Sequence, residues 1–157
     1  DLHYLEGIYH ANSGYSAGVV SPNIVVYNLM GEPASLMVTS SDEFTFDGAY
    51  LTAAFRDGLQ VRVRGYINNH PLYDTTVIPS ATSPTFFEFN YEGVDQLLFS
   101  SSGGTPHPGY EGAGFQFVMD DFTFHVVPEP PSHFLLGLGL AVVLVAVKLR
   151  RRMATAS

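Results

Sequence analysis

Two adjacent carboxylates, Asp120 and Asp121, interrupt an otherwise apolar stretch in the acidic part of the chain. The apolar side chains before the pair occupy odd-numbered positions and those after it even-numbered positions: Phe115, Phe117, Met119, then Phe122, Phe124, Val126. A strand keeps one face buried across such a change only when an extra residue is inserted, so the pattern predicts a β-bulge at the pair. Carboxylates in such a strand need partners. Backbone N–H groups at the bulge are the favoured partners, and a structural Ca²⁺ bound by Asp120 and Asp121, with Asp42 and Glu43 as candidate further ligands, is the alternative.

Other residues that could do chemistry form no recognisable catalytic pattern. Six histidines are scattered without metal-binding spacing: His3, His10, His70, His107, His125 and His133. His125 has the parity opposite to its apolar neighbours, so we expect it at the surface. The chain has no cysteine, and GxSxG, P-loop and dinucleotide motifs are absent. We therefore expect the protein to have no enzymatic activity and to need no cofactor apart from the calcium ion. Because the chain has many acidic residues, a glycosidase with paired carboxylates stays an alternative.

Sugar binding would require aromatic platforms, and the chain has no tryptophan. Five tyrosines could replace it: Tyr50, Tyr66, Tyr73, Tyr91 and Tyr110. Tyrosines in a β-sandwich are mostly half-buried strand residues, so the sequence alone assigns no sugar site.

The elements that must position these residues are strands. The clearest one, "LQVRVRGY", places apolar and polar side chains on opposite faces, first Leu59, Val61 and Val63, then Gln60, Arg62 and Arg64. The preceding Asp57-Gly58 predicts a type I′ turn that joins residues 49–56 and 59–67 into a hairpin. Further short runs predict strands at residues 24–27, 36–39, 72–78, 85–90, 96–99 and 115–127, with a long loop at 100–114. About eight strands predict an all-β, antiparallel, jelly-roll-like sandwich over residues 1–127.

Charge is divided unevenly along the chain. Residues 1–127 contain three arginines and fourteen acidic residues, a formal charge of −11. Such a domain repels phosphate, which argues against a nucleic-acid partner. Its many aromatic residues argue against disorder.

The end of the chain has the composition of a membrane anchor. Residues 134–147 form an uncharged run of 14 residues, apolar on every side. As a helix it spans about 21 Å, less than the ~30 Å hydrocarbon core, so a buried helix is the alternative. The basic cluster that follows, Lys148, Arg150, Arg151 and Arg152, favours a membrane with the cluster in the cytoplasm. We predict a linker at 128–133, a transmembrane helix at 134–149, a basic cytoplasmic tail at 150–157 and an export signal upstream.

This tail resembles the PEP-CTERM sorting signal of bacterial surface proteins. The resemblance covers residues 127–152 and consists of Pro128-Glu129-Pro130, the apolar run and the arginine cluster, although five residues follow Arg152. It implies export, recognition of Pro128, Glu129 and Pro130 by the membrane enzyme exosortase, cleavage near that motif and a host that makes exopolysaccharide. The alternative is that the Pro-Glu-Pro motif is a stiff spacer.

Segments upstream, such as "FDGAYLTAAFRDGLQVRVRGY", are similar to β-sandwich ectodomains that carry the same tag. We therefore expect an exported protein, anchored in the inner membrane with its ectodomain outside and then delivered to the cell surface or matrix. Its expected role is structural or binding. A carbohydrate-binding module of the exopolysaccharide matrix and a surface glycoside hydrolase are the alternatives.

Overall fold

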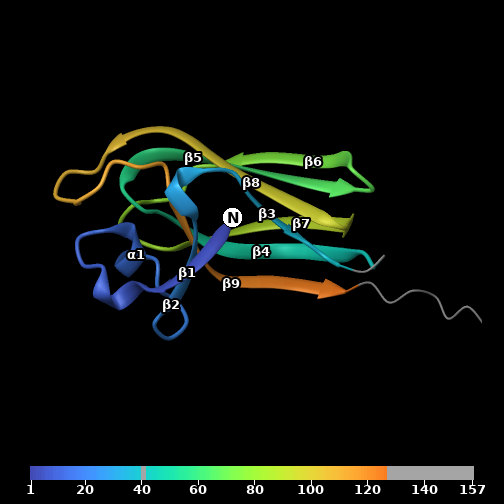
Figure 1. Cartoon of the computed structure of the whole chain (residues 1–157), viewed down its shortest axis with the longest axis horizontal. Helices are drawn as coiled ribbons and strands as arrows, with labels where there is room; N and C mark the ends of the chain where they lie inside the picture. Colours follow the sequence, from blue (N-terminus) through green and yellow to red (C-terminus); the bar gives the residue numbers. More distant parts are fainter. Residues whose placement is uncertain (40–41, 127–157) are drawn as a thin grey trace, which may run out of the picture. The chain divides into compact units, whose positions relative to one another are not determined.

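The computed structural model describes residues 1–39 and 42–126, all within one compact unit, Asp1–Val127. The described part is almost entirely strands (Figure 1). In chain order its elements are β1 (Leu2–Glu6), η1 (Gly7–Tyr9), α1 (Gly14–Ala17), β2 (Ile24–Asn28), η2 (Leu29–Gly31), β3 (Ala34–Met37), β4 (Phe44–Ala53), β5 (Arg56–Ile67), β6 (His70–Val77), β7 (Thr85–Val94), β8 (Gln96–Pro106) and β9 (Phe117–Val126).

The strands form two antiparallel sheets that face each other. One has the order β1-β2-β9-β4-β7 and the other the order β3-β8-β5-β6. In Figure 1, β5, β6 and β8 form the upper layer and β4 and β9 the lower. Without β1, the two remaining sets of four strands have the order of a jelly roll. The predicted all-β antiparallel sandwich is therefore confirmed.

The predicted C-terminal elements lie outside the described residues: the linker at 128–133, the membrane helix at 134–149 and the basic tail at 150–157. Within residues 1–39 and 42–126, no helix has the length and apolar character needed to cross a bilayer.

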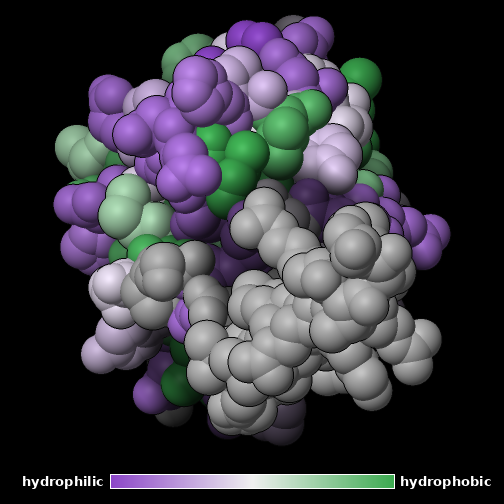
Figure 2. Space-filling view, turned by 90° about the vertical axis from the view of Figure 1, so that its right-hand side faces the viewer, coloured by the Kyte–Doolittle hydropathy of each residue, from purple (hydrophilic) through white to green (hydrophobic). Residues whose placement is uncertain are grey.

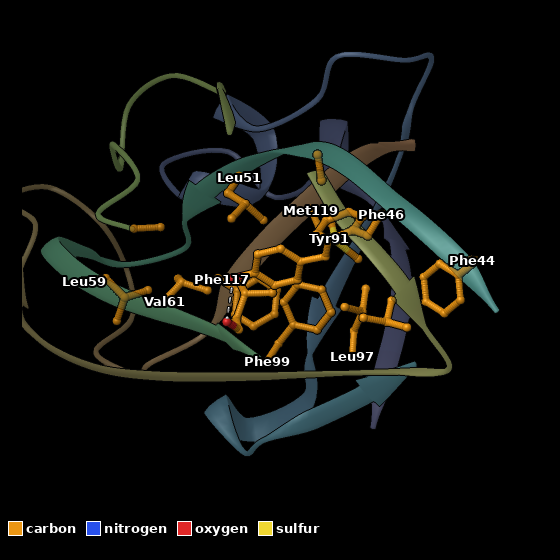
Figure 3. Close-up of a cluster of buried hydrophobic side chains, with 14 of the residues drawn as sticks. Phe44, Phe46, Leu51, Leu59, Val61, Tyr91, Leu97, Phe99, Phe117 and Met119 are labelled. Atoms are coloured by element: carbon orange, nitrogen blue, oxygen red, sulfur yellow. Dashed lines mark hydrogen bonds between the residues drawn. The ribbon is translucent and has the colours of Figure 1, made fainter. Parts of the chain in front are cut away.

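The core fills the space between the sheets (Figure 3). Phe46, which is completely buried, stacks against Phe122 and Phe89 with ring centroids 4.7 and 5.0 Å away. The alternation predicted for β5 is confirmed, because Leu59, Val61 and Val63 are fully buried while the residues between them face outward. Burial of this many aromatic and branched side chains is the main favourable contribution to folding.

The predicted hairpin around Asp57 and Gly58 is wrong. β4 pairs with β7 and β9, whereas β5 pairs with β6 and β8, so the chain passes from one sheet to the other between β4 and β5. Gly58 does have positive φ (71°), but it lies inside β5 in the segment that pairs with Gly103. The prediction was wrong because glycine is favoured at positive φ both in a tight turn and at an irregular position inside a strand.

The β5–β6 connection is the two-residue turn that the sequence reading missed. Asn68 and Asn69 have φ angles of 49° and 63°, and Ile67 lies opposite His70, as in a type I′ hairpin. The loop predicted at residues 100–114 is also partly wrong, because its first seven residues continue β8. Pairing with β5 along this length overrides the weak strand preference of its serines and glycines.

The β-bulge predicted in β9 is confirmed. Tyr50 lies opposite Asp120 and Gly48 opposite Thr123, so two steps along β4 correspond to three along β9. Asp121, the extra residue, has positive φ (45°). The insertion returns Phe122 to the core side of the strand, where it packs against the buried cluster.

Candidate functional site

A polar groove crosses the outer face of the β3-β8-β5-β6 sheet. It has a volume of about 500 Å³ and is lined by two residues from each of three neighbouring strands: Gln60 and Arg62, Asp74 and Thr76, Ser100 and Ser102. We call it the β5 groove. The side chains provide hydroxyl, amide, guanidinium and carboxylate groups, and none is apolar. The groove can therefore donate and accept hydrogen bonds at several regularly spaced points.

The strand alternation explains why these side chains face outward. Leu59, Val61 and Val63 point into the core, so Gln60, Arg62 and Arg64 must point away from it. The register places Ser102 opposite Gln60, and places both Ser100 and Thr76 opposite Arg62. Short side chains on the flanking strands thus lie beside long side chains on β5.

Arg62 and Asp74 form an ion pair inside the β5 groove. Arg62 Nε donates to Asp74 Oδ1 over 2.7 Å, and Nη2 donates to Oδ2. The pKa of the Asp74 carboxyl is below its usual value, mainly because Arg62 donates a hydrogen bond to the carboxylate. Both side chains remain about half exposed, so a ligand can reach the paired groups.

The outward row of β5 extends beyond the groove. Arg64 follows Arg62, and Tyr66 follows Arg64, with the Arg64 guanidinium carbon 6.0 Å from the Tyr66 ring centroid. From Gln60 to Tyr66 the row covers about 20 Å at the usual rise per strand residue. Of the five tyrosines considered as sugar platforms, Tyr66 is the one on this row.

The other four tyrosines have different surroundings. Tyr91 is buried and donates a hydrogen bond to the Val63 carbonyl, and Tyr73 stacks on Tyr91 with centroids 4.5 Å apart. Tyr110 donates to the Ala81 carbonyl. Tyr50 is half-buried on the opposite sheet.

A second depression of about 400 Å³ lies at the end of the sandwich that holds α1. It is lined by His10, Ala11, Asn12, Ser13, Tyr15, Phe55 and Glu111. The Tyr15 hydroxyl has a raised pKa because the side chain is desolvated by burial. The β5 groove and this depression each contain one carboxylate, Asp74 and Glu111. Neither therefore presents, among the described residues, the two flanking carboxylates of a glycosidase.

Hydrophobic side chains are exposed among hydrophilic ones on the end of the molecule shown in Figure 2. An apolar depression of about 260 Å³ is lined by Leu36, Met37, Val38, Phe44, Phe122 and Phe124. Phe124 is 52% exposed, so the second half of β9 is less buried than its sequence predicts.

The two carboxylates at the bulge have different environments. Asp120 is 8% exposed and accepts four hydrogen bonds, from the backbone N–H groups of Val20 (2.7 Å), Ser21 (3.0 Å) and Asp121 (2.8 Å) and from the Ser21 hydroxyl (2.7 Å). Asp121 is exposed. The surroundings of Asp120 match the favoured interpretation, in which backbone N–H groups are its partners, and calcium binding stays a prediction.

The candidate co-ligands of that calcium ion are not near Asp120. Asp42 and Glu43 precede Phe44, which lies opposite Val126, six residues beyond Asp120 along β9 and thus about 20 Å away. Among the residues that the structure describes, no three His, Asp or Glu side chains are grouped to hold a metal ion. His125 is 63% exposed, as predicted, and its ring lies 3.2 Å from the Asp47 carboxylate.

The tail residues assigned to sorting and anchoring lie outside the described part: Pro128, Glu129, Pro130, Lys148, Arg150, Arg151 and Arg152. Sequence reasoning did not assign the β5 groove as a site. The signal for it was present in the polar half of "LQVRVRGY", but the strands that flank it are set by tertiary pairing.

The comparisons with known proteins bear on the fold. No family model and no curated protein matches the chain. A DUF4465 family protein from Bacteroides caccae ATCC 43185 aligns with a TM-score of 0.56 and 13% identity, over 82% of this chain and 73% of that one. This likeness shows a shared fold.

Two carbohydrate-binding modules align with lower TM-scores. TmCBM61, solved in complex with β-1,4-galactotriose, has a TM-score of 0.44 and 12% identity over 82% of each chain. A CBM4 structure has a TM-score of 0.39 and 14% identity, over 80% of this chain and 86% of that one.

Proposed function

We propose that the protein is a non-enzymatic glycan-binding protein of the bacterial surface or extracellular matrix, and that the β5 groove binds the glycan. The observation that carries the proposal is the composition of this groove, in which all six lining side chains are polar. Sugars present many hydroxyl groups, each of which donates and accepts hydrogen bonds. A wall of hydroxyl, amide and paired ionic groups offers complementary donors and acceptors.

The Arg62–Asp74 pair is central to the proposed binding mode. Its donors and acceptors are held in one plane by two parallel hydrogen bonds, which fixes their directions before a ligand arrives. Neighbouring sugar hydroxyls can bind the remaining N–H groups of Arg62 and the free lone pairs of Asp74 without separating the pair. Pre-ordered groups of this kind reduce the entropy lost on binding.

The groove can be tested with the double variant Arg62→Ala, Asp74→Ala. Removing both partners together avoids leaving an unpaired charge, so the fold should be kept. We expect the variant to bind glycans at least about tenfold more weakly than the wild-type protein, as measured by calorimetry against a panel of polysaccharides. Glu88→Ala, on the outer face of the opposite sheet, is the control and should bind normally. Equal binding by the wild-type protein and the double variant would refute the groove as the site.

We also propose that the C-terminal tail delivers this ectodomain to the surface as an exosortase substrate. The support is the order Pro-Glu-Pro, apolar run and arginine cluster in residues 127–152. In a host with exosortase, replacement of Pro128, Glu129 and Pro130 by Ala should leave the unprocessed protein in the inner membrane, as seen by fractionation and mass. Replacement of Met153, Thr155 and Ser157 by Ala is the control. Normal processing of the first variant would contradict the proposal.

A further inference from the structure

Arg64 differs from the other two arginines of the described domain. Arg56 donates three hydrogen bonds to the carbonyl groups of Gly103, Ala113 and Gly104. Arg62 is paired with Asp74. Among the described residues, the guanidinium of Arg64 has neither a hydrogen bond nor an ion pair, and its Nε is shielded from solvent without a partner. An N–H group in this situation is costly and calls for an explanation.

Arg64 has no hydrogen-bonded carboxylate partner, although the register places a carboxylate opposite it. Asp74 lies directly opposite Arg64 on the neighbouring strand β6. Its two carboxylate oxygens nevertheless bind Arg62, which lies diagonally across the same strand pair. On the other side of β5, the residue opposite Arg64 is Leu98, which offers no acceptor in its side chain.

The charge of this face is unusual for the molecule. Residues 1–127 have a formal charge of −11, yet two of their three basic residues occupy adjacent outward positions on β5. Asp74 faces both Arg62 and Arg64, so these three side chains together carry one net positive charge. Acidic groups more than about 8–10 Å away are largely screened at physiological salt, so they reduce this local positive charge only weakly.

We infer that the β5 groove binds an acidic polysaccharide whose sugars carry carboxylates, and that Arg64 is the residue that recognises the carboxylate. The inference rests on the proposed glycan-binding function and specifies its ligand class. A neutral glycan needs only the hydroxyl, amide and ion-pair groups of the groove. A uronate supplies in addition an anionic acceptor for the terminal N–H groups of Arg64, in a charge-assisted hydrogen bond.

The positions of the groups suit a polymer chain. Arg64 lies one outward step from Arg62, about 6.6 Å along β5, and Tyr66 lies one step further. A chain that runs along the row can place hydroxyl groups at the Arg62–Asp74 pair, a carboxylate at Arg64 and a ring face at Tyr66. Recognition would thus be spread over about 20 Å from Gln60 to Tyr66.

The inference can be tested with the full-length protein in a detergent that has no sugar headgroup. The probes are three uronate polymers (polygalacturonate, alginate and a glucuronate-containing xylan), each compared with its carboxyl-reduced product. We expect the wild-type protein to bind at least one native polymer about tenfold more tightly than the reduced form, the change that corresponds to one charge-assisted hydrogen bond.

Three variants test whether Arg64 causes this preference. Arg64→Gln removes the charge and should abolish the preference for the native polymer over its reduced form. Arg64→Lys keeps the charge but loses the planar fork, so an intermediate preference is expected. Asn90→Asp makes the same change in net charge on the exposed outer face of β7, where a positive φ of 51° suits Asp, and should leave the preference intact.

Three results would overturn the inference. If the wild-type protein binds native and reduced polymers equally, the ligand is not recognised by its carboxylates and the inference is wrong. If the double variant Arg62→Ala, Asp74→Ala then binds both polymers more weakly than the wild-type protein, the proposed glycan-binding function still stands. A preference that survives in Arg64→Gln would refute the role of Arg64. Absence of binding to all six probes and to neutral polysaccharides would refute the proposed function as well.

Discussion

The carboxylate of Asp120 connects the last strand to the loop between α1 and β2. It accepts hydrogen bonds from Val20 and Ser21, which are about a hundred residues earlier in the sequence. Because Asp120 is almost fully buried, each of these donors would lose its partner if the carboxylate were removed. The adjacent Asp121 is exposed, so the two carboxylates should differ sharply in their effect on stability.

We predict that Asp120→Asn lowers the free energy of unfolding by about 1–3 kcal/mol, because one acceptor oxygen becomes an N–H donor that faces other donors. Asp121→Asn should be close to neutral, since Asn tolerates positive φ. Both effects are measurable by urea unfolding. Similar losses for the two variants would contradict the difference in their surroundings.

The same variants test calcium. If the folded protein alone binds Ca²⁺ at the bulge, calcium must raise the melting temperature, a chelator must lower it, and Asp120→Asn must abolish the response. Unchanged melting of a metal-free preparation would leave the hydrogen bonds as the complete explanation.

The bulge in β9 and the β5–β6 turn determine which side chains of these strands face each other or the core. The bulge in β9 allows Met119 and Phe122 to face the core on either side of Asp120 and Asp121. The turn at Asn68 and Asn69 starts the pairing of β5 with β6, and a register shift between Gly65 and Tyr66 then places Arg62 opposite Thr76 and Arg64 opposite Asp74. The groove therefore depends on a turn and a register shift that lie outside it.

We predict that Asn69→Gly maintains or increases stability, whereas Asn69→Ala destabilises the protein by about 1–2 kcal/mol. The φ of 63° at Asn69 is favourable for glycine and unfavourable for alanine. Thermal unfolding of the two variants gives the comparison. A stabilising Asn69→Ala would show that the turn conformation is not the one described.

The whole described molecule is a sandwich with all of its long-range pairing inside Asp1–Val127. The chain passes back and forth between the two sheets, so each sheet contains strands from distant parts of the sequence. Folding should consequently be cooperative and include the entire unit.

We predict that residues 1–127, expressed without the tail, form a soluble domain with a β-type circular dichroism spectrum and a single melting transition. The hydrophobic core and the charge of −11 both lie within this segment, which favours folding and solubility. The full-length protein in detergent is the control. A helical or unfolded spectrum for the truncated form would contradict the prediction.

The sequence by itself determined the all-β class, the faces of β5, the bulge in β9 and the asymmetry of charge. These properties follow from short-range patterns, because alternation along a strand has a period of two residues and a parity change occupies a few positions. The errors at Asp57-Gly58 and at residues 100–106 arose where local turn preference competes with pairing between distant strands. The β5 groove was decided only by tertiary structure. It combines residues of β5, β6 and β8, and no local pattern specifies which strands become neighbours or that Asp74 pairs with Arg62 and leaves Arg64 without a partner.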